Sequence, residues 1–214
     1  MSAARKVVIE ITSDNVCPWC YIGKKRLDKA IARAPSNLSF DIRFSPFQLD
    51  PNASPYGVPK LEAYERKFGA DRVEKMIPHM KAVGEAEGIK FDYGGLIANT
   101  LDSHRLLAFA ASQNKQLPVS AALFAAYFEN QQNIGDRETL IEIAAKAGLD
   151  AEAVRAYIES DAGEKEVREE VAGARQRGIS GVPFFRIDGM YEISGAQDPA
   201  VFEEIFAKLA ETSA

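Results

Sequence analysis

The chain of 214 residues has two cysteines, Cys17 and Cys20, which form one Cys-Pro-Trp-Cys unit. Residues 6–12 are β-branched and predict a buried strand before this unit, and Pro18 suits the first turn of a helix after it. A thiolate at Cys17 would face the free N–H groups and positive dipole end of that helix, which stabilise the reactive anion. Cys20 follows one helical turn later on the same face. The spacing therefore predicts an exposed nucleophile at Cys17 and a resolving thiol at Cys20, with Pro18 and Trp19 contacting substrate.

Three other uses of the two thiols stay open. A structural disulfide is disfavoured because closing so short a loop removes little entropy from the unfolded chain. A zinc site would need two more ligands, and the two histidines, His79 and His104, are not spaced as in a zinc finger, so no metal is expected. The third alternative is a pair of buried, unreactive thiols.

A second motif, residues 178–183 (GISGVP), stands directly before a predicted strand. Pro183 cannot donate to a sheet, and a proline that enters a strand from a tight loop is a candidate for the cis isomer. If this loop lies against Cys17, the backbone of Val182 can pair with an extended peptide or a glutathione as an added strand would.

The remaining elements indicate an α/β fold. Residues 38–44 alternate between apolar and polar side chains, which predicts a half-buried strand and completes a right-handed βαβ unit with residues 6–12. Residues 46–60 contain four prolines and predict a loop. Residues 184–187 and 190–193 flank Asp-Gly and predict a hairpin, and a last helix begins after Asp198. The helices expected between these parts cover residues 61–68, 71–87, 102–113, 118–131, 136–147, 151–161 and 163–177.

This order predicts a small α/β domain from residues 1–60 and 179–214, interrupted by an inserted α-helical domain at residues 61–178. We call residues 61–178 the helical insertion. Because no Gly/Ser-rich linker flanks it, we expect the helical insertion to pack against the sheet.

Composition excludes several classes of partner. The net charge of −5 argues against nucleic acid, and no apolar run is long enough to cross a bilayer. The first fifteen residues lack the apolar core of a secretion signal, so we expect a cytoplasmic protein.

Together, the strand, CPWC, helix, helical insertion, VPFF, Asp-Gly hairpin and SGAQ resemble the DsbA-type thioredoxin-like superfamily. More narrowly they resemble its FrnE-like branch, near the 2-hydroxychromene-2-carboxylate isomerases and kappa-class glutathione transferases. The resemblance runs over nearly the whole chain and implies a thioredoxin-like fold, with Cys17 attacking, Cys20 resolving and Pro183 as a cis-proline beside them. The segment from Asn99 to Arg105 is similar to one shared in this branch.

That similarity makes Asn99 and His104 candidate substrate-binding residues. For His104 the alternative is equally favoured: a hydrogen-bonded residue at the edge of a helical core, with no contact to substrate. Asp14, close before Cys17, either tunes the thiol or accepts its proton, or simply ends the strand.

The predicted function is thiol–disulfide exchange with protein or small-molecule thiols and disulfides, with no required cofactor and glutathione as a candidate co-substrate. The resemblance implies a serine in place of Cys17 in the isomerases and transferases, so the intact pair favours exchange. The absence of a histidine between the cysteines predicts a weaker oxidant than periplasmic DsbA. Two alternatives remain: a glutathione-dependent isomerase or transferase acting on a small aromatic substrate, and a redox-sensing or chaperone-like binding protein. The resemblance also implies a homodimer.

Overall fold

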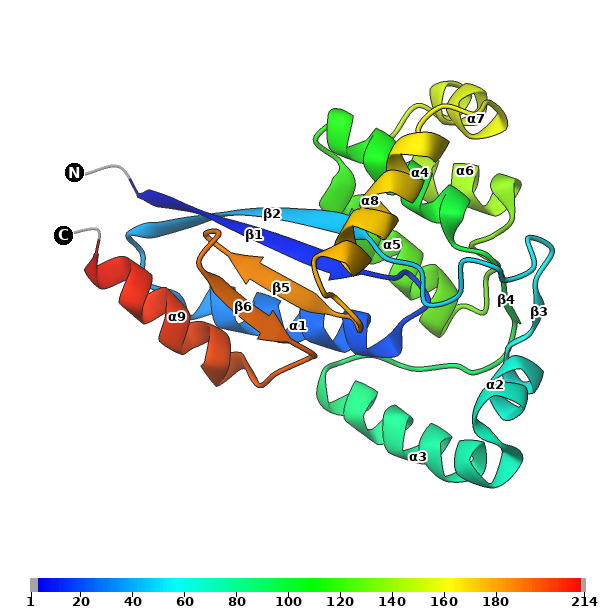
Figure 1. Cartoon of the computed structure of the whole chain (residues 1–214), viewed down its shortest axis with the longest axis horizontal. Helices are drawn as coiled ribbons and strands as arrows, with labels where there is room; N and C mark the ends of the chain where they lie inside the picture. Colours follow the sequence, from blue (N-terminus) through cyan, green and yellow to red (C-terminus); the bar gives the residue numbers. More distant parts are fainter. Residues whose placement is uncertain (1–3, 213–214) are drawn as a thin grey trace.

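The computed structural model describes residues 4–212 and centres on a four-stranded sheet in the order β2-β1-β5-β6 (Figure 1). β1 pairs in parallel with β2, while β5 runs antiparallel to both β1 and β6. The strands are β1 (Arg5–Ser13), β2 (Leu38–Pro46), β5 (Phe184–Ile187) and β6 (Tyr191–Ser194). The parallel β1–β2 pair confirms the predicted βαβ unit, and the mixed α/β fold class is confirmed.

The burial of the two long strands follows their sequences. Val7, Ile9 and Ile11 of β1 are fully buried because β1 has a strand on each side and helices on both faces. β2 is an edge strand, so its alternating apolar residues Phe40 and Ile42 are only partly buried. An edge position also accommodates Pro46, which extends β2 beyond the predicted end at residue 44.

Two helices, α1 (Pro18–Ala32) and α9 (Pro199–Glu211), pack together on one side of the sheet. The Asp198 side chain caps α9 by accepting the N–H of Ala200. The turn between β5 and β6 differs from the prediction, because Met190 belongs to the turn and not to the strand. Asp188 and Gly189 both have positive φ, of 54° and 71°, and leave Met190 largely exposed.

The helical insertion contains all seven predicted helices, most of them within two residues of the expected ends. α4, α5 and α8 contact β2, so these helices pack against the sheet as expected. Asp150 accepts a backbone N–H at the start of its helix, as Asp136 does. The helices are α2 (Lys60–Phe68), α3 (Ala70–Ala86), α4 (Leu101–Ser112), α5 (Gln116–Glu129), α6 (Arg137–Lys146), α7 (Ala151–Glu159) and α8 (Glu164–Gln176).

Two short strands were not predicted. β3 (Val58–Pro59) pairs with β4 (Leu96–Ile97), so the segment 46–60 is not loop throughout. A two-residue strand carries no alternation that a sequence could reveal.

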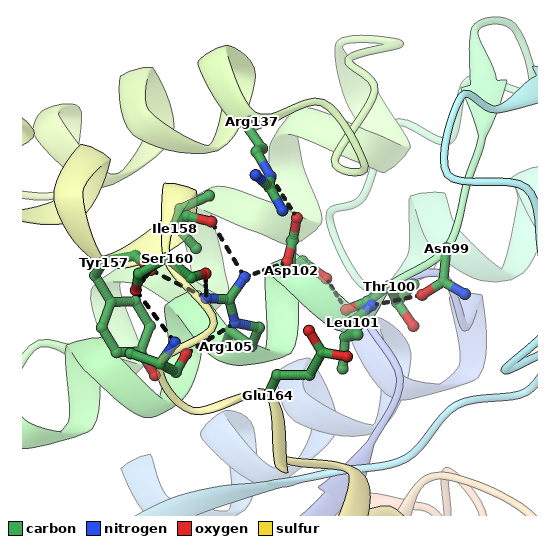
Figure 2. Close-up of polar contacts among 12 residues, drawn as sticks. Asn99, Thr100, Leu101, Asp102, Arg105, Arg137, Tyr157, Ile158, Ser160 and Glu164 are labelled. Carbon is green, nitrogen blue, oxygen red and sulfur yellow. Dashed lines mark hydrogen bonds and ion pairs between the residues drawn. The ribbon is translucent and has the colours of Figure 1, made fainter. Parts of the chain in front are cut away.

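Arg105 of α4 ties the connection between α7 and α8 to the rest of the helical insertion (Figure 2). Its guanidinium is buried and also pairs with Asp102, which in turn pairs with Arg137. It donates to four backbone carbonyls, those of Tyr157, Ile158, Ser160 and Ala162.

The sheet and the helical insertion share one continuous hydrophobic core, which includes Ile9, Phe185, Phe124 and Ile158. Within residues 4–212, no helix is both long and apolar enough to cross a membrane. The division into two domains stays a prediction.

Candidate active site

Cys17 is the last residue before α1, and its backbone is extended, with φ −90° and ψ 114°. Its N–H donates to the carbonyl of Asp14 at 3.0 Å, and its own carbonyl accepts the N–H of Cys20 at 3.0 Å. Pro18 is the first helical residue, where the missing N–H costs no intrahelical bond. The side chain of Cys17 makes no capping hydrogen bond to the N–H groups of α1. Its sulfur therefore stands at the N-terminus of the helix and is not used to cap it. Both cysteines are free thiols in this structure.

The two thiols differ in their surroundings. Cys20 is completely buried, and this burial raises the pKa of its thiol well above the usual value, with Cys17 raising that pKa further. Cys17 retains 5% of its surface exposed. The prediction that Cys17 is exposed was therefore wrong. Cys17 is buried because the loop that carries Val182 lies against it. The Cys17 thiol donates to the Val182 carbonyl, with 3.6 Å between sulfur and oxygen.

The Val182–Pro183 peptide bond is cis, the isomer for which Pro183 was a candidate. Pro183 also lies against α1 at Gly23, where a Cβ would stand only 2.9 Å from its ring. Trp19, between the two cysteines in the sequence, is 39% exposed and presents an apolar surface to solvent. The structure thus brings Cys17, Cys20, Val182 and Pro183 together, while their roles, and those of Pro18 and Trp19, stay predictions.

Asp14, before Cys17 in the turn after β1, and His104 on α4 are both almost completely buried. One carboxylate oxygen of Asp14 accepts the N–H of Leu49 at 2.7 Å, and the other lies 3.4 Å from Nε2 of His104. The same nitrogen donates to the Phe47 carbonyl at 2.9 Å. These contacts hold residues 47–49 against the turn before Cys17, so His104 has a structural role whether or not it also binds substrate.

Asn99 is occupied by contacts within the chain. Its Oδ1 accepts the N–H of Leu101 (Figure 2) and the amide of Gln48, and its Nδ2 donates to the carbonyls of Pro51 and Ala53. Asn99 therefore shapes the proline-rich loop, and its contact with a substrate remains a prediction.

Lys60 and Tyr64 were missed by the sequence analysis. Tyr64 interacts electrostatically with Cys17, and burial raises the pKa of its phenol to about 12. Lys60 is 1% exposed, and burial lowers the pKa of its ammonium to about 8. The two residues are four apart on α2 and share one face of the helix, a spacing that was visible in the sequence.

Among residues 4–212, no three metal-ligating side chains come together, and Cys17 and Cys20 are the thiols that the site offers.

A family model described as the DSBA-like thioredoxin domain matches residues 8–207. The chain is 34% identical to a probable DsbA oxidoreductase from Streptomyces coelicolor, with a TM-score of 0.88 over 97% of this chain and 91% of that one. It is 27% identical over 201 residues to the uncharacterized protein YwbO of Bacillus subtilis, which covers 92% of this chain and 94% of the relative.

The fold is also shared with the cytosolic disulfide reductase DsbM from Pseudomonas aeruginosa, solved with GSH. That structure is 18% identical, with a TM-score of 0.63 over 96% of this chain and 98% of that one. The resemblance inferred from the motifs is confirmed. The chain belongs to the DSBA-like thioredoxin domain family, which supports thiol–disulfide oxidoreductase as its general class of activity.

Proposed function

We propose that the protein catalyses thiol–disulfide exchange, with Cys17 as the attacking thiol and Cys20 as the resolving thiol. The observation that carries this proposal is the asymmetry of the pair. Cys17 stands at a helix N-terminus and keeps 5% of its surface exposed, whereas Cys20 is completely buried and burial raises the pKa of its thiol, so that thiol stays protonated.

In the reducing direction, the Cys17 thiolate attacks one sulfur of a substrate disulfide. The substrate S–S bond breaks, one substrate thiolate leaves and takes up a proton, and a mixed disulfide with Cys17 forms. Cys20 then loses its proton and attacks the sulfur of Cys17, which releases the second substrate thiol. The substrate gains two electrons and the enzyme is left with a Cys17–Cys20 disulfide. The opposite direction transfers that disulfide to a substrate dithiol.

The Val182 carbonyl would guide the substrate, because it already accepts a hydrogen bond from the Cys17 thiol. An extended substrate segment that pairs with this backbone would bring its disulfide against Cys17. Trp19 would cover the apolar side of the same segment.

Glutathione is our candidate for the small thiol that restores the reduced enzyme. Support comes from DsbM, whose structure with GSH has the same fold. The cytoplasmic location expected from the sequence is likewise part of the proposal, and it agrees with the cytosolic location in the name of DsbM.

The test compares Cys17→Ser, Cys20→Ser and the unchanged protein in the reduction of a dye-labelled peptide disulfide by glutathione. Cys17→Ser is expected to show only the rate without enzyme, and Cys20→Ser to accumulate a mixed disulfide visible by mass spectrometry at Cys17. Full activity of Cys17→Ser would refute the proposal. Undiminished turnover of Cys20→Ser would favour the glutathione-dependent isomerase or transferase, and peptide binding without turnover in the unchanged protein would favour a binding protein.

A further inference from the structure

A cavity of about 300 Å³ lies between the sheet and the helical insertion, and Cys17, Cys20 and Val182 are not among its lining residues. Its apolar wall is formed by Phe44 of β2, Leu107 of α4 and Val167 of α8. Ala108 and Ala111 of α4 form part of its exposed edge. This volume is at the lower end of the range for small-molecule sites, so it suits a compact ligand.

The buried end of the cavity carries a hydrogen-bond acceptor that lacks a donor. Asn15 is 1% exposed; its Nδ2 donates to Ser103, but its Oδ1 has no partner among residues 4–212. Burying an unpaired acceptor costs about 1–3 kcal/mol, so a donor at this end would be stabilised.

The charges around the cavity have the same preference. Glu10 and Glu170, both exposed, line it, and burial raises the pKa of the Glu170 carboxyl while the nearby His104 and Arg177 lower it. Arg43, the arginine among the lining residues, pairs with Asp41 at 2.7 Å and also interacts electrostatically with Glu10. The side-chain amide of Gln116 accepts the N–H of Phe44 and donates to the Phe44 carbonyl, so both ends of the amide already have partners. The lining therefore combines acceptors and negative charge with an apolar wall.

From these contacts we infer that the cavity is a binding site for a small organic cation. Its N–H donors would face Asn15 and Glu170, and its apolar body would lie on Phe44, Leu107 and Val167. Anions and neutral alcohols would bind less well, because they offer no charge to the carboxylates. Since Asn15 lies two residues before Cys17, an occupant would touch the turn that positions the thiol. The inference does not depend on the proposed function.

The experiment titrates the reduced, full-length protein with benzylammonium and, separately, with benzyl alcohol, which has the same size but no charge. Binding is followed by the amide shifts in ¹H–¹⁵N NMR spectra. Three variants accompany the unchanged protein. Glu170→Gln removes a lining carboxylate, Ala108→Trp fills the open side of the cavity, and Ala121→Trp adds the same bulk to an exposed face of α5 that does not line the cavity.

The unchanged protein and Ala121→Trp are expected to bind benzylammonium saturably, at least about tenfold more tightly than benzyl alcohol, with shifts at residues 13–15, 43–46 and 104–111. Glu170→Gln is expected to lose most of this preference, and Ala108→Trp to lose binding of both compounds. Equal affinity for the two compounds, undiminished binding by Ala108→Trp, or shifts that do not saturate or lie elsewhere would each overturn the inference.

Discussion

Lys60 shows how a single buried charge is accommodated near the thiol site. Its ammonium donates to the carbonyl of Tyr127 at 3.0 Å, lies 3.9 Å from the centre of the Tyr127 ring, and forms no ion pair within residues 4–212. The Tyr127 carbonyl is one of the last four of α5, which no N–H of the same helix can reach. Lys60 therefore caps the C-terminus of α5, where a positive charge is favourable, while its side chain is almost completely shielded from solvent.

Lys60 should make stability depend on pH above neutrality. Its pKa falls from the ordinary 10.5 to about 8 in the folded protein, so between these pH values the unfolded chain binds more protons. The contribution of this residue to stability should rise with pH across that window and be flat below it. At about 1.36 kcal/mol for each pH unit, the total is at most about 3 kcal/mol.

Urea unfolding of the unchanged protein and Lys60→Met at pH 7, 8, 9 and 10 measures this effect. The difference between the two should change in favour of the unchanged protein above pH 8. Lys75→Met, which removes an exposed lysine of α3, should show no such trend. A difference for Lys60→Met that is the same at every pH would contradict this explanation.

Arg105 is a second buried cation, held by backbone carbonyls and Asp102 (Figure 2). A lysine cannot reproduce the five donors of the guanidinium, so Arg105→Lys would leave several buried carbonyls without a partner. We expect the free energy of unfolding to fall by about 2–4 kcal/mol in a denaturant titration. Arg155→Lys, at a partly exposed pair with Glu138, should cost less than about 1 kcal/mol. Equal losses in both variants would show that the carbonyl contacts of Arg105 contribute little.

At the scale of elements, the position of α1 against the Pro183 loop depends on one close approach. Gly23 lies in the interior of α1, and a Cβ there would stand 2.9 Å from Pro183, 3.1 Å from Phe185 and 3.4 Å from Ala196. The glycine is therefore required by the distance between helix and loop, although a glycine inside a helix lowers its stability.

Gly23→Ala is expected to destabilise the protein by about 1–3 kcal/mol and to lower disulfide reductase activity, because the added methyl separates α1 from Pro183. Gly173→Ala in α8 is the matched control. Its Cβ would meet only the mobile end of Arg177 at 3.3 Å, so alanine should stabilise by about 0.5–1 kcal/mol and leave activity unchanged. Thermal unfolding and the reductase assay test both variants. Stabilisation by Gly23→Ala would show that the helix and the loop can move apart freely.

The elements were largely predictable from the sequence because each carries a local signal. The apolar run of β1, the caps Asp136 and Asp150 and the Asp-Gly turn all depend on neighbouring residues. The cis bond before Pro183 was a candidate on the same grounds. The contacts of Lys60 with α5, the occupied amide of Asn99 and the reduced exposure of Cys17 depend on segments distant in sequence. Such contacts leave no trace in local periodicity.

At the scale of the whole molecule, the start of β1 and the end of α9 lie at the end of the sheet opposite α4–α8 (Figure 1). The shared core fixes the helical insertion against the sheet, so residues from both parts surround the turn before Cys17. His104 and Ser103 come from the helical insertion and Asp14 and Asn15 from the turn. This arrangement gives the helical insertion a direct contact with the proposed redox site, which a thioredoxin-like sheet alone would lack.

The most direct test of the account is a redox titration of the Cys17–Cys20 pair against glutathione buffers. Trp19 is the only tryptophan and lies between the two cysteines, so its fluorescence reports their state. The account predicts one reversible two-electron transition, within the span of about −120 to −270 mV known for exchange enzymes. A pair that does not oxidise reversibly, in a protein that still binds glutathione, would contradict thiol–disulfide exchange as its function.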